Sequence, residues 1–175
     1  MSSAIGNAIA DSLQLSLSYA ERLLKDVPAE TFARFATPGG HVVTSNHPAF
    51  VYGHLSLYPI RIVEALGGDT AAIAPPTQFA EVFSKDATCQ DDPDGTVYPP
   101  MEDVTSSFFQ GYRAVLPLLR ESDGAVFEQP NPLGGRMAEL FPTLGSMHAF
   151  YVGGHIMMHL GQVSAWRRMQ GLGAA

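Results

Sequence analysis

Apolar residues recur at steps of three and four positions through residues 3–25, and this spacing predicts an amphipathic helix from Ser3 to Lys25. Pro28 and the polar residues after it end that helix. The expected buried stripe consists of Ile5, Ile9, Leu13, Leu17, Ala20 and Leu24.

A second helix is predicted over residues 45–66, with Ser45 or Asn46 as its cap and Gly67-Gly68 as its stop. Pro48 is tolerated in the first turn of a helix, where its missing N–H has no partner anyway. Pro59 removes an internal backbone hydrogen bond, so we expect a bend near Leu55.

A third helix is predicted from Met101 to Glu121, with Pro117 perturbing its last turn. Its apolar stripe consists of Val104, Phe108, Tyr112, Val115 and Leu119.

The fourth predicted helix, Thr143 to Gly171, contains glycines at positions 145, 153, 154 and 161. Each glycine costs a helix up to about 1 kcal/mol relative to alanine. A neighbouring helix at close range, or room for a bound group, would explain them; tolerance in a well-packed helix is the alternative.

The connections at residues 67–100 and 122–142 are rich in proline, glycine and aspartate, which is typical of turns. A short helix is predicted over residues 77–83, and the longer connection suits a lid or wall over a site. Four long helices joined in this way predict an all-α, up-and-down four-helix bundle with long connecting loops, forming a single domain over residues 1–175.

The composition is consistent with this predicted helical domain. Apolar residues make up 46% of the 175 residues and charged residues 15%, which excludes a disordered chain. A net charge of −7 argues against a nucleic-acid partner, which would require a basic face. Arg167 and Arg168, the one adjacent basic pair, are interpreted as charges that complement the dipole at a helix C-terminus.

Location is predicted from what the sequence lacks. We find neither a signal peptide nor a run of 18 apolar residues, so we expect a cytoplasmic protein with no membrane partner. The lone Cys89 cannot form an internal disulfide. Its neighbours Asp91 and Asp92 should raise the pKa of its thiol, so we interpret it as a bystander.

The candidate chemistry lies in the histidines. His155 and His159 are four residues apart, which places both imidazoles on one helix face, close enough to share a metal ion. His54 on the second helix would complete a three-histidine site with an open coordination position. The spacing alone also fits ordinary core histidines, so both interpretations stay open at this point.

Other polar residues near these helices are secondary candidates. Gln162 lies on the side of the helix that carries His155 and His159, so its amide can orient a ligand or a bound water. A hydrogen bond to another helix or to a loop is the equal alternative. Side chains expected to line the pocket, each with a structural role as the alternative, are Asn46, Tyr52 and Tyr151.

Two further histidines are predicted to lie outside the metal site. His148 falls on nearly the stripe of His155 but about 10 Å away along the axis, so we place it at the rim or in the core. His47 shares a stripe with His54 and is placed at the surface or the rim, with a role as a fourth ligand or as a support for a ligand as the alternatives.

Five segments carry a resemblance to a known family. Phe141-Pro142-Thr143, the run from His155 to Gln162 and Ala165-Trp166-Arg167-Arg168 resemble the last helix of the DinB-like superfamily, and Gly53-His54-Leu55 resembles its first histidine motif. Tyr98-Pro99, before the third helix, is also similar. The resemblance extends over the whole chain in helix order and is strongest at residues 141–171.

This resemblance implies a four-helix bundle in which His54, His155 and His159 hold a divalent metal ion, zinc or nickel. It also implies a homodimer and a thiol-dependent transferase or isomerase that uses a low-molecular-weight thiol such as mycothiol or bacillithiol. Ile156 departs from the family, whose members often carry an acid there, so we expect no acid–base role at that position. A metal-dependent hydrolase and a non-catalytic, stress-responsive metal protein are the alternatives.

Overall fold

The computed structural model describes residues 3–175, and this part of the chain is helical, without β-strands. The expected all-α class is therefore confirmed. The α-helices are α1 (Ala4–Leu24), α2 (Pro48–Leu55), α3 (Pro59–Ala65), α4 (Phe79–Phe83), α5 (Met101–Glu121), α6 (Gly124–Glu128), α7 (Gly135–Leu140), α8 (Leu144–Ala149) and α9 (His155–Met169).

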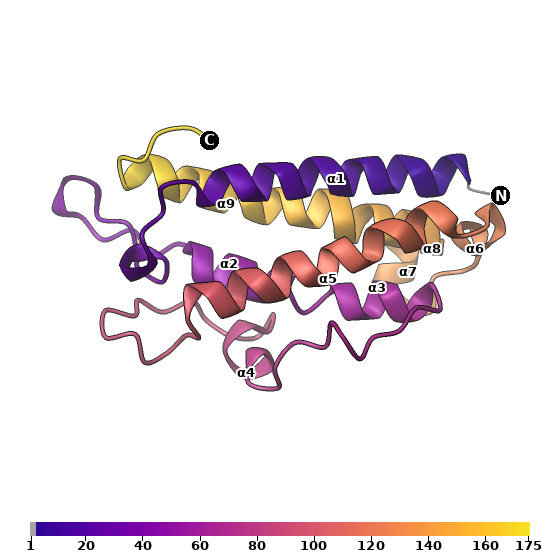
Figure 1. The fold of residues 1–175 in the computed structure, drawn as a ribbon, viewed down its shortest axis with the longest axis horizontal. Coiled ribbons are helices and arrows are strands. Elements are labelled where there is room, and N and C mark those ends of the chain that lie inside the picture. Colours follow the sequence, from indigo (N-terminus) through magenta and orange to yellow (C-terminus); the bar gives the residue numbers. More distant parts are fainter. Residues whose placement is uncertain (1–2) are drawn as a thin grey trace.

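The long helices run along the longest axis of the molecule (Figure 1). Helix α1 packs against both α5 and α9, and α2 packs against the same two helices from the other side. Each pair contributes side chains to one continuous hydrophobic core. None of the helices in residues 3–175 combines the length and the apolar character needed to cross a membrane.

Helices α1 and α5 follow the predicted apolar periodicity. Ser3 caps α1 by accepting a hydrogen bond from the backbone N–H of Gly6 at 2.9 Å, which satisfies one of the free donors of the first turn. The predicted stripe of α5, from Val104 to Leu119, is fully buried. In α1 the stripe begins one turn later than predicted, because Ile5 is 44% exposed.

The predicted second helix is divided in two. Helix α2 ends at Leu55, and α3 begins at Pro59, where proline has no N–H to leave unpaired. The Ser56 hydroxyl donates to the Gly53 carbonyl at 2.6 Å and satisfies an acceptor at the end of α2. The proline therefore breaks the helix at the expected place, rather than bending a continuous one.

The predicted fourth helix is divided by a π-helical turn at Phe150–Gly154, between α8 and α9. A Cβ atom at Gly153 would lie 2.7 Å from the Ser12 hydroxyl oxygen, so this glycine allows α1 to approach closely. Gly161 has open space around it and serves no such contact.

One other prediction is corrected by the fold, and one is extended. Residues 122–142, expected to be a loop, contain the short helices α6 and α7. Arg167 and Arg168 lie in the last turn of α9, as predicted. Arg167 is in addition buried, and its guanidinium donates to the Leu23 carbonyl at 2.8 Å and to the Lys25 carbonyl. A buried cation is stable there because the C-terminal carbonyls of α1 carry partial negative charge.

Candidate metal centre

Three histidines from two helices meet between α2 and α9. His54 lies near the end of α2, His155 is the first residue of α9, and His159 follows one turn later. One ring nitrogen from each lies within 4.8 Å of the others, so the three nitrogens can converge on a single ion. The structure thus brings together all three residues that the sequence singled out.

Hydrogen bonds fix the proton on one ring nitrogen of two of these histidines. His54 Nδ1 lies 2.8 Å from the Phe83 carbonyl oxygen, which can only accept, so Nδ1 carries the proton and Nε2 keeps its lone pair. His159 Nδ1 donates in the same way to the Gln162 Oε1 at 3.0 Å. Both rings are therefore oriented as metal-binding histidines usually are, with the outer nitrogen bonded to an acceptor.

The Gln162 side chain is itself held in place. Asn46, the residue before His47 at the start of α2, donates from its Nδ2 to the same Gln162 Oε1 at 3.1 Å. The Gln162 Oε1 therefore accepts from both His159 and Asn46, so the expected contact with a candidate ligand and the alternative contact with another segment of the chain are both present.

Burial keeps the imidazoles neutral. It lowers the pKa of His54 and of His159, and it lowers the pKa of His155 to about 3, with smaller contributions from the neighbouring histidines. Neutral imidazole is the form that binds a metal. The His155 Nδ1 is buried and has no hydrogen-bond partner within residues 3–175.

A pocket of about 410 Å³ adjoins the cluster and includes His54 and His159 in its wall. Much of the remaining wall comes from the long connection between α3 and α5, as the sequence predicted for a lid or wall. The lining residues are Asn46, Phe50, His54, Ser84, Lys85, Ala87, Thr88, Cys89 and His159.

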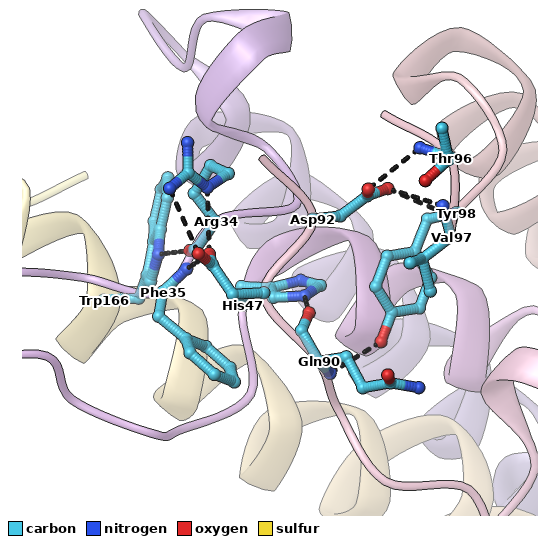
Figure 2. A network of polar contacts seen from close by, with 10 residues as sticks. Arg34, Phe35, His47, Gln90, Asp92, Thr96, Val97, Tyr98 and Trp166 are labelled. Atoms are coloured by element: carbon cyan, nitrogen blue, oxygen red, sulfur yellow. Dashed lines mark hydrogen bonds and ion pairs between the residues drawn. The ribbon is translucent and has the colours of Figure 1, made fainter. Parts of the chain in front are cut away.

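Residues 90–98, at the end of this connection nearer to α5, take part in the polar network shown in Figure 2. The backbone N–H groups of Thr96, Val97 and Tyr98 donate to the Asp92 carboxylate at 2.9 to 3.0 Å, and Arg34 pairs with Asp91 at 2.9 and 3.1 Å. Figure 2 also shows the Tyr98 hydroxyl accepting from the Gln90 N–H, at 2.9 Å. The connection is therefore a fixed wall on this side of the pocket.

His47 belongs to the same network, and its expected surface or rim position is wrong. Its side chain is fully buried. Its Nδ1 accepts from the Phe50 N–H at 3.2 Å and caps α2, which leaves Nε2 to donate to the Gln90 carbonyl at 2.8 Å (Figure 2). Sequence spacing gave no signal for this contact, because Gln90 lies 43 residues away.

Three other candidates lie away from the pocket. Tyr52 is fully buried in the core and donates to the Ala20 carbonyl at 2.6 Å, so the prediction that it lines the pocket is wrong. The Tyr151 ring contacts the His155 ring, with 5.9 Å between centroids, but lines a different pocket. His148 is buried in the wall of that second pocket. The π-helical turn between His148 and His155 places the two side chains on different faces of the helix.

Tyr58 is a site residue that the sequence reasoning missed. Its hydroxyl lies 3.2 Å from the His54 Nε2, and its ring packs against both His54 and His155, with centroid distances of 5.2 and 4.6 Å. The available signal was its position four residues after His54. The break between α2 and α3 hid this signal, because the helix was expected to bend there rather than to end.

Cys89 is closer to the candidate site than its sequence suggested, since it lines the same pocket as His54 and His159. The pKa of its thiol is raised to about 11, as expected in direction, but the principal cause is burial rather than the charge of Asp91. The thiol is therefore protonated at neutral pH and a poor nucleophile.

The three-histidine donor set fits a borderline-soft divalent ion, because imidazole suits zinc, nickel, copper and iron. Comparison with known proteins adds no identification: no protein-family model matches the chain, and a search of curated proteins found no significant match. The resemblance to the DinB-like superfamily stays a prediction.

Proposed function

We propose that this chain is a divalent-metal-dependent enzyme in which His54, His155 and His159 hold the ion beside an open pocket. The observation that supports this most is the convergence of one nitrogen from each ring within 4.8 Å, under burial that keeps the rings neutral. Three histidine ligands leave one tetrahedral position for a water or a substrate.

The reaction class and the finer fold type rest on the sequence resemblance. We propose a DinB-like four-helix bundle that carries zinc or nickel, forms a homodimer and catalyses a thiol-dependent transfer or isomerisation. A bound divalent ion would lower the pKa of a coordinated thiol and so supply a thiolate nucleophile. Within the chain, Gln162 and the Phe83 carbonyl orient two of the ligands, and the pocket supplies space for the cosubstrate.

An external thiol is favoured over an internal one by the state of Cys89. This is the chain's one cysteine, and burial raises the pKa of its thiol to about 11. The pocket beside the histidines, about 410 Å³, has the size of a small-molecule site. A purely structural metal site would be closed and would need no such space.

The first test measures metal content on untagged protein by plasma mass spectrometry. We expect about one equivalent of a divalent ion per chain in the wild type, and its loss in the His155→Ala variant. His41→Ala is the matched control, because His41 is exposed and lies outside the cluster. Equal metal content in both variants, or no metal uptake by the wild type, contradicts the proposed site.

The second test addresses the thiol. Cobalt-loaded protein titrated with a low-molecular-weight thiol should develop a near-ultraviolet sulfur-to-cobalt charge-transfer band. Because Cys89 lines the same pocket, the titration is repeated in Cys89→Ser, where the band should persist. A band that disappears with Cys89 assigns the sulfur to the protein, and the absence of any band at saturating thiol favours a hydrolase or a non-catalytic metal protein.

A further inference from the structure

The hydroxyl of Tyr58 is hydrogen-bonded to His54 Nε2, the ring nitrogen that would coordinate a metal ion. Tyr58 immediately precedes α3, and its oxygen lies 3.2 Å from the His54 Nε2. The ring is held there by its contacts with His54 and His155 and by the Arg61 guanidinium, which lies 5.8 Å from the ring centroid.

The direction of this hydrogen bond follows from the other side of the His54 ring. Nδ1 donates to the Phe83 carbonyl at 2.8 Å, so in the neutral ring Nε2 carries no proton and acts only as an acceptor. The Tyr58 hydroxyl is therefore the donor. An imidazole nitrogen has a single in-plane lone pair, so this lone pair serves either the hydroxyl or a metal ion.

We infer that Tyr58 competes with the metal for His54 and so regulates metal occupancy of the site. This inference rests on the proposed function, because it requires that the three-histidine cluster bind an ion. When an ion takes the Nε2 lone pair, the Tyr58 hydroxyl loses its acceptor. It is then free to donate to the group that occupies the open coordination position.

Competition between Tyr58 and the metal predicts the direction in which metal affinity changes when the hydroxyl is removed. A residue that merely supports the site weakens metal binding when it is altered, whereas a competitor strengthens binding when it is removed. The net free energy of one neutral hydrogen bond corresponds to about a two- to tenfold change in an equilibrium constant. Tyr58→Phe, which removes only the hydroxyl, should therefore bind zinc about two- to tenfold more tightly than the wild type.

Tyr19→Phe is the matched control. Tyr19 lies on α1, away from the cluster, and like Tyr58 it has an arginine three residues later over its ring, with Arg22 at 5.4 Å from the centroid. Zinc affinities of the wild type and both variants are measured by competition with a chromophoric chelator. We expect tighter binding in Tyr58→Phe alone.

Two outcomes separate this inference from the proposed function. If neither the wild type nor either variant binds zinc, both fail together. If the wild type binds zinc and Tyr58→Phe binds it equally or more weakly, the competition is wrong and the metal site remains.

A readout on the wild-type protein avoids any effect of the substitution on folding. The ¹³C resonance of the Tyr58 Cζ atom reports the hydrogen bonding of its hydroxyl. It should shift with one equivalent of zinc, while the Tyr19 resonance stays in place. An unchanged Tyr58 resonance in zinc-saturated protein overturns the inference.

Discussion

His148 permits a quantitative test of what an unpaired buried imidazole costs this fold. The side chain is fully buried on α8, and neither ring nitrogen has a hydrogen-bond partner within residues 3–175. Burial lowers the pKa of His148 to about 4. Replacement by leucine keeps the approximate volume and removes both unpaired nitrogens, so His148→Leu should raise the free energy of unfolding by about 1–3 kcal/mol at neutral pH.

The effect should grow as the pH falls. The ordinary pKa of histidine is about 6.5, so between that value and the folded-state value of about 4 the unfolded chain binds a proton more readily than the folded chain. The stability that depends on neutral His148 is complete above the unfolded pKa and is lost as the pH falls toward the folded pKa. The difference between variant and wild type should therefore widen by about 2 kcal/mol between about pH 7.5 and about pH 5.

Urea unfolding, followed by far-ultraviolet circular dichroism with a chelator present, measures this difference at both pH values. The other buried histidines titrate in both proteins, so their contribution cancels in the difference. His41→Leu, at an exposed histidine, should show no such widening. An advantage for His148→Leu that stays constant between the two pH values refutes the reasoning, because the imidazole is then not the group that titrates.

Further predictions concern the packing of α2 and the support of His159. A Cβ atom at Gly53 would lie 2.5 Å from atoms of the buried Phe83 ring, so Gly53→Ala should lower the free energy of unfolding by about 1–3 kcal/mol. Gly161→Ala, with open space around the new methyl group, should instead raise it by up to about 1 kcal/mol; urea unfolding compares the two. Gln162→Leu removes the acceptor for His159 and should weaken zinc binding about tenfold in chelator competition, while equal affinity would show that the amide does not orient the ligand.

Local periodicity was sufficient to predict the two long continuous helices, α1 and α5. The stripe in α5 is uninterrupted over 21 residues, and helical spacing alone determines which of its side chains are buried. The i, i+4 spacing of His155 and His159 likewise fixes their relative position once α9 exists. His54 was chosen over His47 because it lies within the predicted second helix beside Gly53, whereas His47 lies near the start of that helix, and the resemblance then pointed to the same residue.

The contacts that the sequence did not reveal depend on distant segments of the chain. His47 is buried because the backbone at Gln90 folds back over it. Arg167 is buried because it donates to the carbonyls of Leu23 and Lys25 at the end of α1. Neither partner can be identified from local spacing, since loop closure over such separations follows no periodic pattern.

The π-helical turn at Phe150–Gly154 has a consequence for how this chain tolerates change in length. A π-helical turn accommodates one more residue than an α-helical turn, and one residue corresponds to a rotation of about 100° in an α-helix. Helices α8 and α9 can therefore keep separate registers: α8 faces α1 and α6, while α9 presents two histidines toward α2. A chain one residue shorter at this turn can form an uninterrupted α-helix with both faces still in contact with their partners, whereas a deletion between His155 and His159 would rotate one histidine away from the other. The turn thus allows the packing of α8 to change without moving the two histidines of α9.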